Sequence, residues 1–227
     1  MSMPTLDDPP RTWADALAAE LRAPDVTNVP ESRQVRRRYS RALANADWRY
    51  VYDVATALLA NHGYRWIACE LVAEHKEASR AVDVEAIEAL GRGMASWGAV
   101  DSFGRTLAGP AWVRGQLADA DIIRWAESPG RWWRRAALVS TVALNRPAQG
   151  GQGDAERTLM ICRMLATDRD DMIYKALSWA LRELVPHDPA AVQDFIVEHD
   201  AGLAAQVKRE VRNKLATGLK NPRRGRG

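Results

Sequence analysis

The sequence predicts an all-α protein whose short helices pair and stack as a solenoid. Apolar residues recur at the spacing of an amphipathic helix along most of the 227 residues. No stretch alternates apolar and polar residues with the period of a strand, so no sheet is expected. Short helices joined by short links are typical of stacked helix pairs, which present a concave face lined by one helix of each pair. We expect one such domain over residues 1–220.

In the first half of the chain, turn-forming residues separate the helical patterns. The turn-rich connector APDVTNVPES follows the first helix, and His62-Gly63 separates the third from the fourth. Ser96 is a favourable N-cap for the last helix of this half. The expected helices lie at residues 11–22, 34–45, 48–61, 64–78, 84–91 and 96–107.

The second half continues the helical pattern. Its first segment holds one or two short helices, and the turn Ser128-Pro129-Gly130 precedes the next. The loop RPAQGGQGDAE is expected to be flexible because of its glycine content. The expected helices lie at residues 112–125, 131–144, 154–166, 171–185, 189–199 and 202–219.

Composition limits the class of protein. Hydrophobic residues make up 47% and charged residues 27%, which favours a folded core with a polar surface. No apolar run approaches the roughly 20 residues of a membrane helix, and the N-terminus lacks the pattern of a signal peptide. Cys69 and Cys162 lie in apolar helical contexts and indicate core thiols in a reducing cytoplasm. Neither a metal site nor a cofactor is expected, because metal-ligand spacings and phosphate-binding glycine loops are missing.

Charge is concentrated at the C-terminus. Residues 206–227 contain eight basic residues and one glutamate, a net charge of +7, whereas the whole chain carries +3. Such a segment favours a polyanionic partner, although a solubilising terminus explains it equally well. Residues 221–227 are interpreted as a basic tail.

One indole of the helix expected over 171–185 lies outside its core stripe. Trp179 points roughly 140° away from the apolar residues at 100° per residue. Lys175 lies one turn before Trp179, and Arg182 roughly one turn after it. This arrangement indicates a surface that stacks on a sugar or base with cations on the phosphates. The alternative is a surface tryptophan covered by a neighbouring helix.

Trp97 and Asp101 are four residues apart and therefore neighbours on one helix. The apolar residues Val100, Phe103 and Leu107 form the core stripe beside them. An indole face favours cations, and a carboxylate stabilises developing positive charge or orients a water molecule. On spacing alone, an exposed aspartate beside a packed tryptophan is the favoured interpretation.

Arg135 falls on the apolar stripe of the helix expected over 131–144. A guanidinium there needs an anion, because an unpaired buried charge is costly. Asp101 and a DNA phosphate are the two candidate partners. Trp132 and Trp133 are interpreted as packing residues.

Three segments carry a family resemblance: SWGAVDSF, WRRAAL and YKALSWALREL, with weaker support from WIACELVAEHKE and KREVRNKL. From about Val35 onward, the chain resembles the AlkD-like DNA alkylation repair glycosylases, a HEAT-like repeat family. The resemblance implies a solenoid whose concave basic face holds duplex DNA. It also implies hydrolysis of the N-glycosidic bond of cationic alkylpurines such as N3-methyladenine and N7-methylguanine. No metal or cofactor is implied.

The resemblance implies roles for individual residues. Asp101 matches the catalytic aspartate, and Trp97 and Trp179 match the tryptophans that contact the deoxyribose of the lesion. Arg135 matches the arginine that holds the DNA backbone nearby. The remaining cations expected to contact DNA are Arg134, Lys175 and Arg182. The sequence departs from many relatives before Asp101, where Ser96 and Gly98 replace a tryptophan and an acid.

We therefore expect a base-excision repair glycosylase that acts on duplex DNA as a cytoplasmic, nucleoid-associated monomer, without a membrane partner. One alternative is a non-catalytic relative that binds branched or damaged DNA. That alternative is disfavoured because the chain has all four residues that match the family's site, Trp97, Asp101, Arg135 and Trp179. The other alternative is a helical-repeat scaffold for another protein, which predicts no salt-sensitive DNA affinity.

Overall fold

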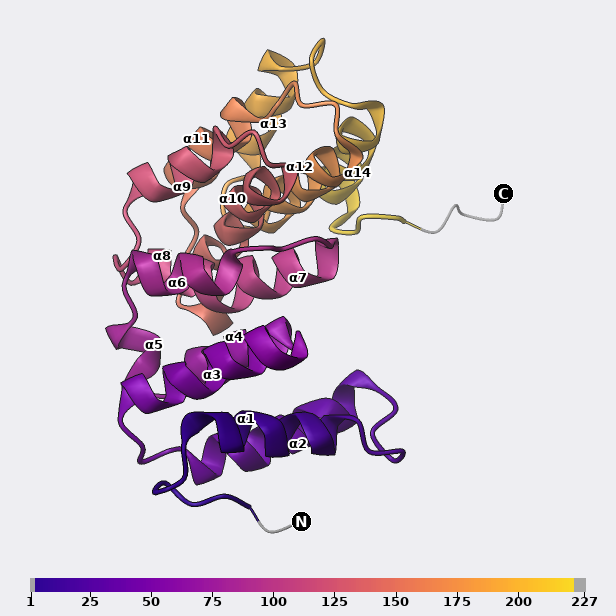
Figure 1. Ribbon diagram of the computed structural model, residues 1–227. Helices are drawn as coiled ribbons and strands as arrows, with labels where there is room; N and C mark the ends of the chain where they lie inside the picture. Colours follow the sequence, from indigo (N-terminus) through magenta and orange to yellow (C-terminus); the bar gives the residue numbers. More distant parts are fainter. Residues whose placement is uncertain (1–2, 223–227) are drawn as a thin grey trace. The chain divides into compact units, whose positions relative to one another are not determined.

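The computed structural model describes residues 3–222, and every regular element in this range is a helix (Figure 1). No strand occurs among the described residues, which confirms the all-α prediction. The chain divides into two compact units, Met1–Gly93 and Met94–Gly227. The single domain expected over residues 1–220 stays a prediction, and most of the expected basic tail, residues 223–227, lies outside the described residues.

Unit 1 is built around a buried aromatic pair and an internal ion-pair network. Trp13 and Tyr39 meet edge to face with ring centroids 6.0 Å apart. Arg36 is 3% exposed and reaches Glu70 at 3.1 Å as well as Glu74, so it joins the second helix to the fourth. The helices of this unit are α1 (Pro10–Leu21), α2 (Val29–Ala42), α3 (Trp48–His62), α4 (Arg65–Glu74), α5 (Ala78–Ala81) and α6 (Val84–Gly91).

Unit 2 contains the remaining helices, including one π-helical segment (η1) and one 3-10 turn (η2). Its elements are α7 (Trp97–Ser102), η1 (Phe103–Ala108), α8 (Gly109–Val113), α9 (Asp119–Ala126), α10 (Arg131–Leu144), η2 (Pro147–Gln149), α11 (Ala155–Met164), α12 (Asp171–Leu184), α13 (Pro189–Glu198) and α14 (Ala205–Thr217).

The packing of unit 2 is that of a helical repeat. Helix α9 packs on α10, α11 on α12, and α13 on α14, so consecutive helices form pairs. The second helices of these pairs also pack on one another, α10 on α12 and α12 on α14, and α7 with η1 packs on α10. These contacts define one row of helices, α7–α10–α12–α14, which we call the inner row. The concave DNA-binding face of the expected solenoid stays a prediction.

Several expected boundaries are wrong by three residues or more, including the end of α2 at Ala42 and the start of α14 at Ala205. Two others have a clear local reason. Helix α2 begins at Val29, five residues earlier than expected, because Asn28 and Glu31 form a capping box. The Glu31 amide donates to Asn28 Oδ1 at 3.0 Å, and the Asn28 amide donates to Glu31 Oε2 at 3.2 Å. The helix expected over 64–78 ends at Glu74, because His75 is extended and its Nδ1 accepts from the Ala78 amide at 3.1 Å.

The helix expected over 96–107 changes character at Phe103. Residues 103–108 adopt π-helical hydrogen bonding, which is rare and frequently found at functional sites. The buried residues Val100, Phe103 and Leu107 confirm the predicted core stripe. Phe103 packs against Trp133 at 5.8 Å between ring centroids, which confirms Trp133 as a packing residue.

Glycines allow this segment to lie unusually close to α10. A Cβ atom on Gly109 would lie 2.7 Å from both the Ala143 Cβ and the Ser140 carbonyl oxygen. We expect Gly109→Ala to lower the free energy of unfolding by about 1–3 kcal/mol through overpacking. Thermal unfolding measures this effect. The matched control is Gly98→Ala in α7, where nothing lies within 4 Å of the added atom and no loss is expected.

The glycine-rich loop before α11 packs against the inner row instead of extending freely. The Gly153 amide donates to the Leu144 carbonyl at 3.0 Å, and the Gln149 side chain donates to the Arg105 carbonyl. A Cβ atom on Gly151 would lie 2.0 Å from the Ala143 carbonyl oxygen, so the backbone is in close contact with α10. The glycines therefore serve close packing, and the expectation of a flexible loop is wrong.

Candidate functional site

Asp101 and Arg135 form a bidentate ion pair between α7 and α10. Ser96 caps α7, as expected, by accepting from the Ala99 amide at 3.3 Å. Asp101 lies at the other end of this short helix, where Arg135 Nε donates to Oδ1 at 2.9 Å and Nη2 donates to Oδ2 at 3.0 Å. The side chains are 7% and 21% exposed for Arg135 and Asp101. Asp101 is therefore the anion that the buried position of Arg135 requires.

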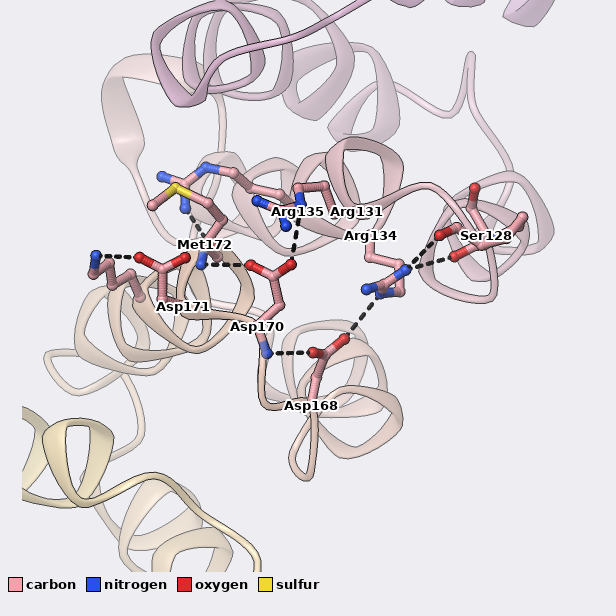
Figure 2. A network of polar contacts seen from close by, with 10 residues as sticks. Ser128, Arg131, Arg134, Arg135, Asp168, Asp170, Asp171 and Met172 are labelled. Carbon is pink, nitrogen blue, oxygen red and sulfur yellow. Dashed lines mark hydrogen bonds and ion pairs between the residues drawn. The ribbon is translucent and has the colours of Figure 1, made fainter.

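Arg135 also connects this pair to α12. Its Nη1 donates to the Met172 carbonyl, at the first turn of α12 (Figure 2). One guanidinium thus joins three helices of the inner row. Because Met172 and Trp179 are seven residues apart, they lie on the same side of α12, roughly 10 Å apart along its axis.

The environment of Asp101 makes its carboxyl group harder to ionise. Burial raises the pKa of Asp101 above its usual value, while the charges of Arg135 and Arg105 and the hydrogen bonds from Arg135 oppose this rise. A raised pKa beside a specific cation is typical of a functional carboxylate.

Trp97 is 61% exposed and lies one turn before Asp101. The interpretation favoured by spacing, a packed tryptophan beside an exposed aspartate, is therefore wrong, because the burial is reversed. A large exposed indole beside a half-buried carboxylate is available to a ligand. All nine tryptophans lie among the described residues, and Trp97 is the only exposed one, since Trp48, Trp66, Trp132, Trp133 and Trp179 are half-buried and Trp13, Trp112 and Trp125 are buried.

Trp179 is half-buried and held in one orientation. Its Nε1 donates to Glu183 Oε1 at 2.9 Å, one turn further along α12. Glu183 is in turn paired with Arg146 at 3.3 Å. Among the described residues, no hydrogen bond, ion pair or ring contact joins Trp179 to Trp97 or Asp101. The structure therefore places all three on the inner row without joining them directly.

Arg134 is engaged within the protein through two of its three guanidinium nitrogens. Its Nε donates to Asp168 Oδ2 at 2.9 Å, and its Nη1 donates to the carbonyl oxygens of Ser128 and Pro129, both at 3.0 Å. Figure 2 shows Arg134 between the turn that precedes α10 and the loop that precedes α12. These contacts hold its side chain between the two segments.

The two cations that flank Trp179 also have protein partners. Lys175 pairs with Asp171 at 2.8 Å, and the two side chains are 43% and 49% exposed. Arg182 Nε donates to Ser178 Oγ at 3.3 Å and lies 3.8 Å from the buried Glu210 of α14. Of these two, Lys175 is the more accessible to an anion, because surface ion pairs exchange at little cost.

Arg105 is a site residue that the sequence interpretation missed. It follows Asp101 by four residues, the same spacing that places Trp97 before Asp101. Its charge acts on Asp101 in the direction that lowers the pKa of the carboxyl group. This spacing was visible in the sequence, but nothing in the sequence distinguished Arg105 from a solvated surface arginine.

Other kinds of site find no support in the part of the chain described by the structure. In residues 3–222, no three histidine, cysteine, aspartate or glutamate side chains gather as metal ligands would. No helix there is long and apolar enough to cross a membrane. Cys69 and Cys162 are buried, unpaired thiols, and burial raises the pKa of each above its usual value. Both confirm the expectation of core thiols.

The fold and the site together define a helical-repeat protein that presents an arginine-bound carboxylate beside an exposed indole. The chain belongs to the DNA alkylation repair enzyme family, whose model matches residues 27–215. This match confirms the resemblance identified from the three sequence segments and assigns the protein a role in repair of alkylated DNA. A comparison with curated proteins gives no match.

Proposed function

We propose that the protein is a DNA glycosylase that hydrolyses the N-glycosidic bond of cationic alkylpurines, such as N3-methyladenine and N7-methylguanine, in duplex DNA. The observation that carries this proposal is the Asp101 carboxylate, bound on one side by Arg135 and flanked by the exposed indole of Trp97. Family membership supplies the substrate class, alkylated DNA.

The chemistry of the substrate suits a single carboxylate. An N3- or N7-alkylated purine already carries positive charge, so its departure as a neutral base needs little acid catalysis. Positive charge then develops on the deoxyribose, in an oxocarbenium-like transition state. A carboxylate aimed at that charge stabilises it and can also orient the attacking water. Asp101 is assigned this role.

Arg135 favours the ionised form of Asp101 and orients its carboxylate. Each carboxylate oxygen accepts one hydrogen bond from the guanidinium. Because a carboxylate oxygen has two lone pairs, each retains an acceptor site for water or for contact with the sugar. Arg135 would also reach a DNA phosphate, as the family resemblance implies, by giving up part of this pairing.

The two tryptophans are assigned to the sugar. Indole faces attract cations and stack on flat or weakly polar groups, so Trp97 and Trp179 would hold the deoxyribose as it becomes positive. Lys175, Arg182 and Arg134 are retained as proposed DNA contacts, and Lys175 needs the smallest rearrangement to serve as one.

The deciding experiment measures release of base from duplex DNA that contains N7-methylguanine. Release by the protein without added metal or cofactor supports a glycosylase. Salt-sensitive binding without release would instead support the non-catalytic DNA-binding alternative. If the protein neither binds the duplex nor releases the base, the scaffold alternative is supported.

Trp179→Ala is expected to lower base release by about tenfold or more, with a small loss of stability. Trp179 is half-buried and makes one hydrogen bond, to Glu183, so little core packing depends on it. Single-turnover release and thermal unfolding measure the two effects. Trp179→Phe retains an aromatic face and should keep most of the activity. A fall in melting temperature as large as that of a core tryptophan would contradict the assignment.

A further inference from the structure

Two of the cations predicted to contact DNA, Arg134 and Arg135, already make hydrogen bonds and ion pairs within the protein. Arg135 uses three of its N–H groups on Asp101 and the Met172 carbonyl, and only 7% of its side chain is exposed. Arg134 is similarly engaged, by Asp168 and two carbonyl oxygens. Two N–H groups of each guanidinium have no partner among the described residues, but the contacts above hold both side chains against the protein, at 7% exposed for Arg135 and 21% for Arg134. Binding of the backbone beside the lesion therefore favours a cation that has no partner within the protein.

Arg105 meets this requirement. It is half-buried in η1, and no hydrogen bond or ion pair within residues 3–222 engages its guanidinium. All five N–H donors of the guanidinium remain available to an anion. Arg105 follows Asp101 by four residues, so both side chains leave the same side of the chain, and its charge favours the ionised form of Asp101 by lowering the pKa of that carboxyl group.

The backbone that carries Arg105 is fixed on both sides. A Cβ atom on the preceding residue, Gly104, would lie 2.9 Å from Val139 Cγ1, so η1 is in close contact with α10 there. The Gln149 side chain donates to the Arg105 carbonyl from the glycine-rich loop. Because the backbone is already fixed, binding of a ligand by Arg105 orders only its side chain.

We propose that Arg105 binds the DNA phosphate next to the alkylated nucleotide. The assignment of that nucleotide as the substrate rests on the proposed glycosylase function. A guanidinium binds a phosphate through two parallel charge-assisted hydrogen bonds, which fixes the backbone as well as attracting it. Arg105 also offsets the repulsion between the phosphate and the negative Asp101.

The test compares Arg105→Gln with Arg163→Gln as the matched control. Arg163 lies on α11, outside the inner row, where its side chain is 50% exposed and pairs only loosely with Glu198 at 3.9 Å. Both variants remove one positive charge from unit 2. Affinity is measured between about 50 and 200 mM salt on a duplex with a stable abasic-site analogue, and melting temperature is measured for each protein.

Arg105→Gln is expected to weaken binding about tenfold and to reduce the slope of log affinity against log salt by about 0.9, the value for one phosphate contact. Arg163→Gln should leave the slope unchanged, and Arg105→Lys should retain most of it. Equal slopes for Arg105→Gln and Arg163→Gln would overturn the proposal. This outcome is independent of catalysis, so a protein that binds without releasing bases would refute the glycosylase function and still test Arg105.

A second readout separates a contact near Asp101 from a remote one. The charged side chains acting on Asp101 are Arg135 from α10 and Arg105 from η1. Loss of the Arg105 charge disfavours the carboxylate, so the acid limb of the pH–rate profile should move to higher pH in Arg105→Gln. It should stay in place in Arg163→Gln. An unshifted acid limb in Arg105→Gln would contradict the placement of Arg105 beside the reacting sugar.

Discussion

Asp101→Asn is expected to reduce base release by about 10²–10³-fold while affinity for the same duplex changes little. Asparagine keeps the shape of the side chain but removes the negative charge that would stabilise the developing oxocarbenium ion. DNA affinity depends mainly on phosphate contacts, which this substitution leaves in place. Single-turnover release and a binding titration on the same substrate measure the two quantities.

A matched carboxylate controls for general electrostatic effects. Asp171 is an exposed aspartate of α12 that pairs with Lys175, and Asp171→Asn removes the same charge from the same unit. It should retain most of the activity. Equal losses in the two variants would remove Asp101 from the centre of the reaction. The amide introduced by Asp101→Asn would turn N–H groups toward Arg135, so rates should be compared at a temperature where both variants are folded.

Arg135→Met is expected to have the largest effect on stability, about 2–3 kcal/mol at neutral pH. Removal of one partner of a fully buried pair costs about 3–5 kcal/mol, and the figure is smaller here because Asp101 is 21% exposed. The loss should depend on pH. Without Arg135 the pKa of Asp101 rises further, so the destabilisation is greatest above that pKa and shrinks as acid protonates the carboxyl group. Unfolding measured at about pH 8 and about pH 5 tests the sign.

The double variant Asp101→Asn with Arg135→Met completes the test. Because the methionine then faces a neutral amide instead of an unpaired carboxylate, the double variant should be more stable than Arg135→Met alone at neutral pH. Purely additive losses, or a loss in Arg135→Met that is the same at both pH values, would contradict the ion-pair account. The acid limb of base release should also move to higher pH in Arg135→Met.

The helices could be predicted from sequence because an apolar stripe is a local property. Two of the boundaries that failed depend on individual side chains acting on the backbone, as Asn28 and Glu31 do at α2 and His75 does after α4. The π-helical segment could not be predicted, because close contact of Gly104 and Gly109 with α10 accompanies it and that contact is tertiary. Helical periodicity does not report which neighbour a glycine faces.

For the candidate site, the sequence indicated which residues are involved better than it indicated their contacts and burial. Asp101 was correctly considered as the anion for Arg135, since a cation on an apolar stripe needs a partner. The exposure of Trp97 was predicted wrongly, because spacing places a residue on an edge without indicating what covers that edge. The partners of Arg134 and Arg182, Asp168 and Glu210, come from other parts of the chain and have no local signal in the sequence.

The contacts of α10 have a consequence for the fluctuations of the site. Arg135 reaches Asp101, 34 residues earlier, and Arg134 reaches Asp168, 34 residues later, so α10 is crosslinked to the segments on either side. Local opening of α7 would separate a buried guanidinium from its carboxylate, which makes partial unfolding of that short helix alone unfavourable. The amides around Asp101 should therefore exchange with solvent hydrogen together with those of α10 and α12, as one cooperative unit.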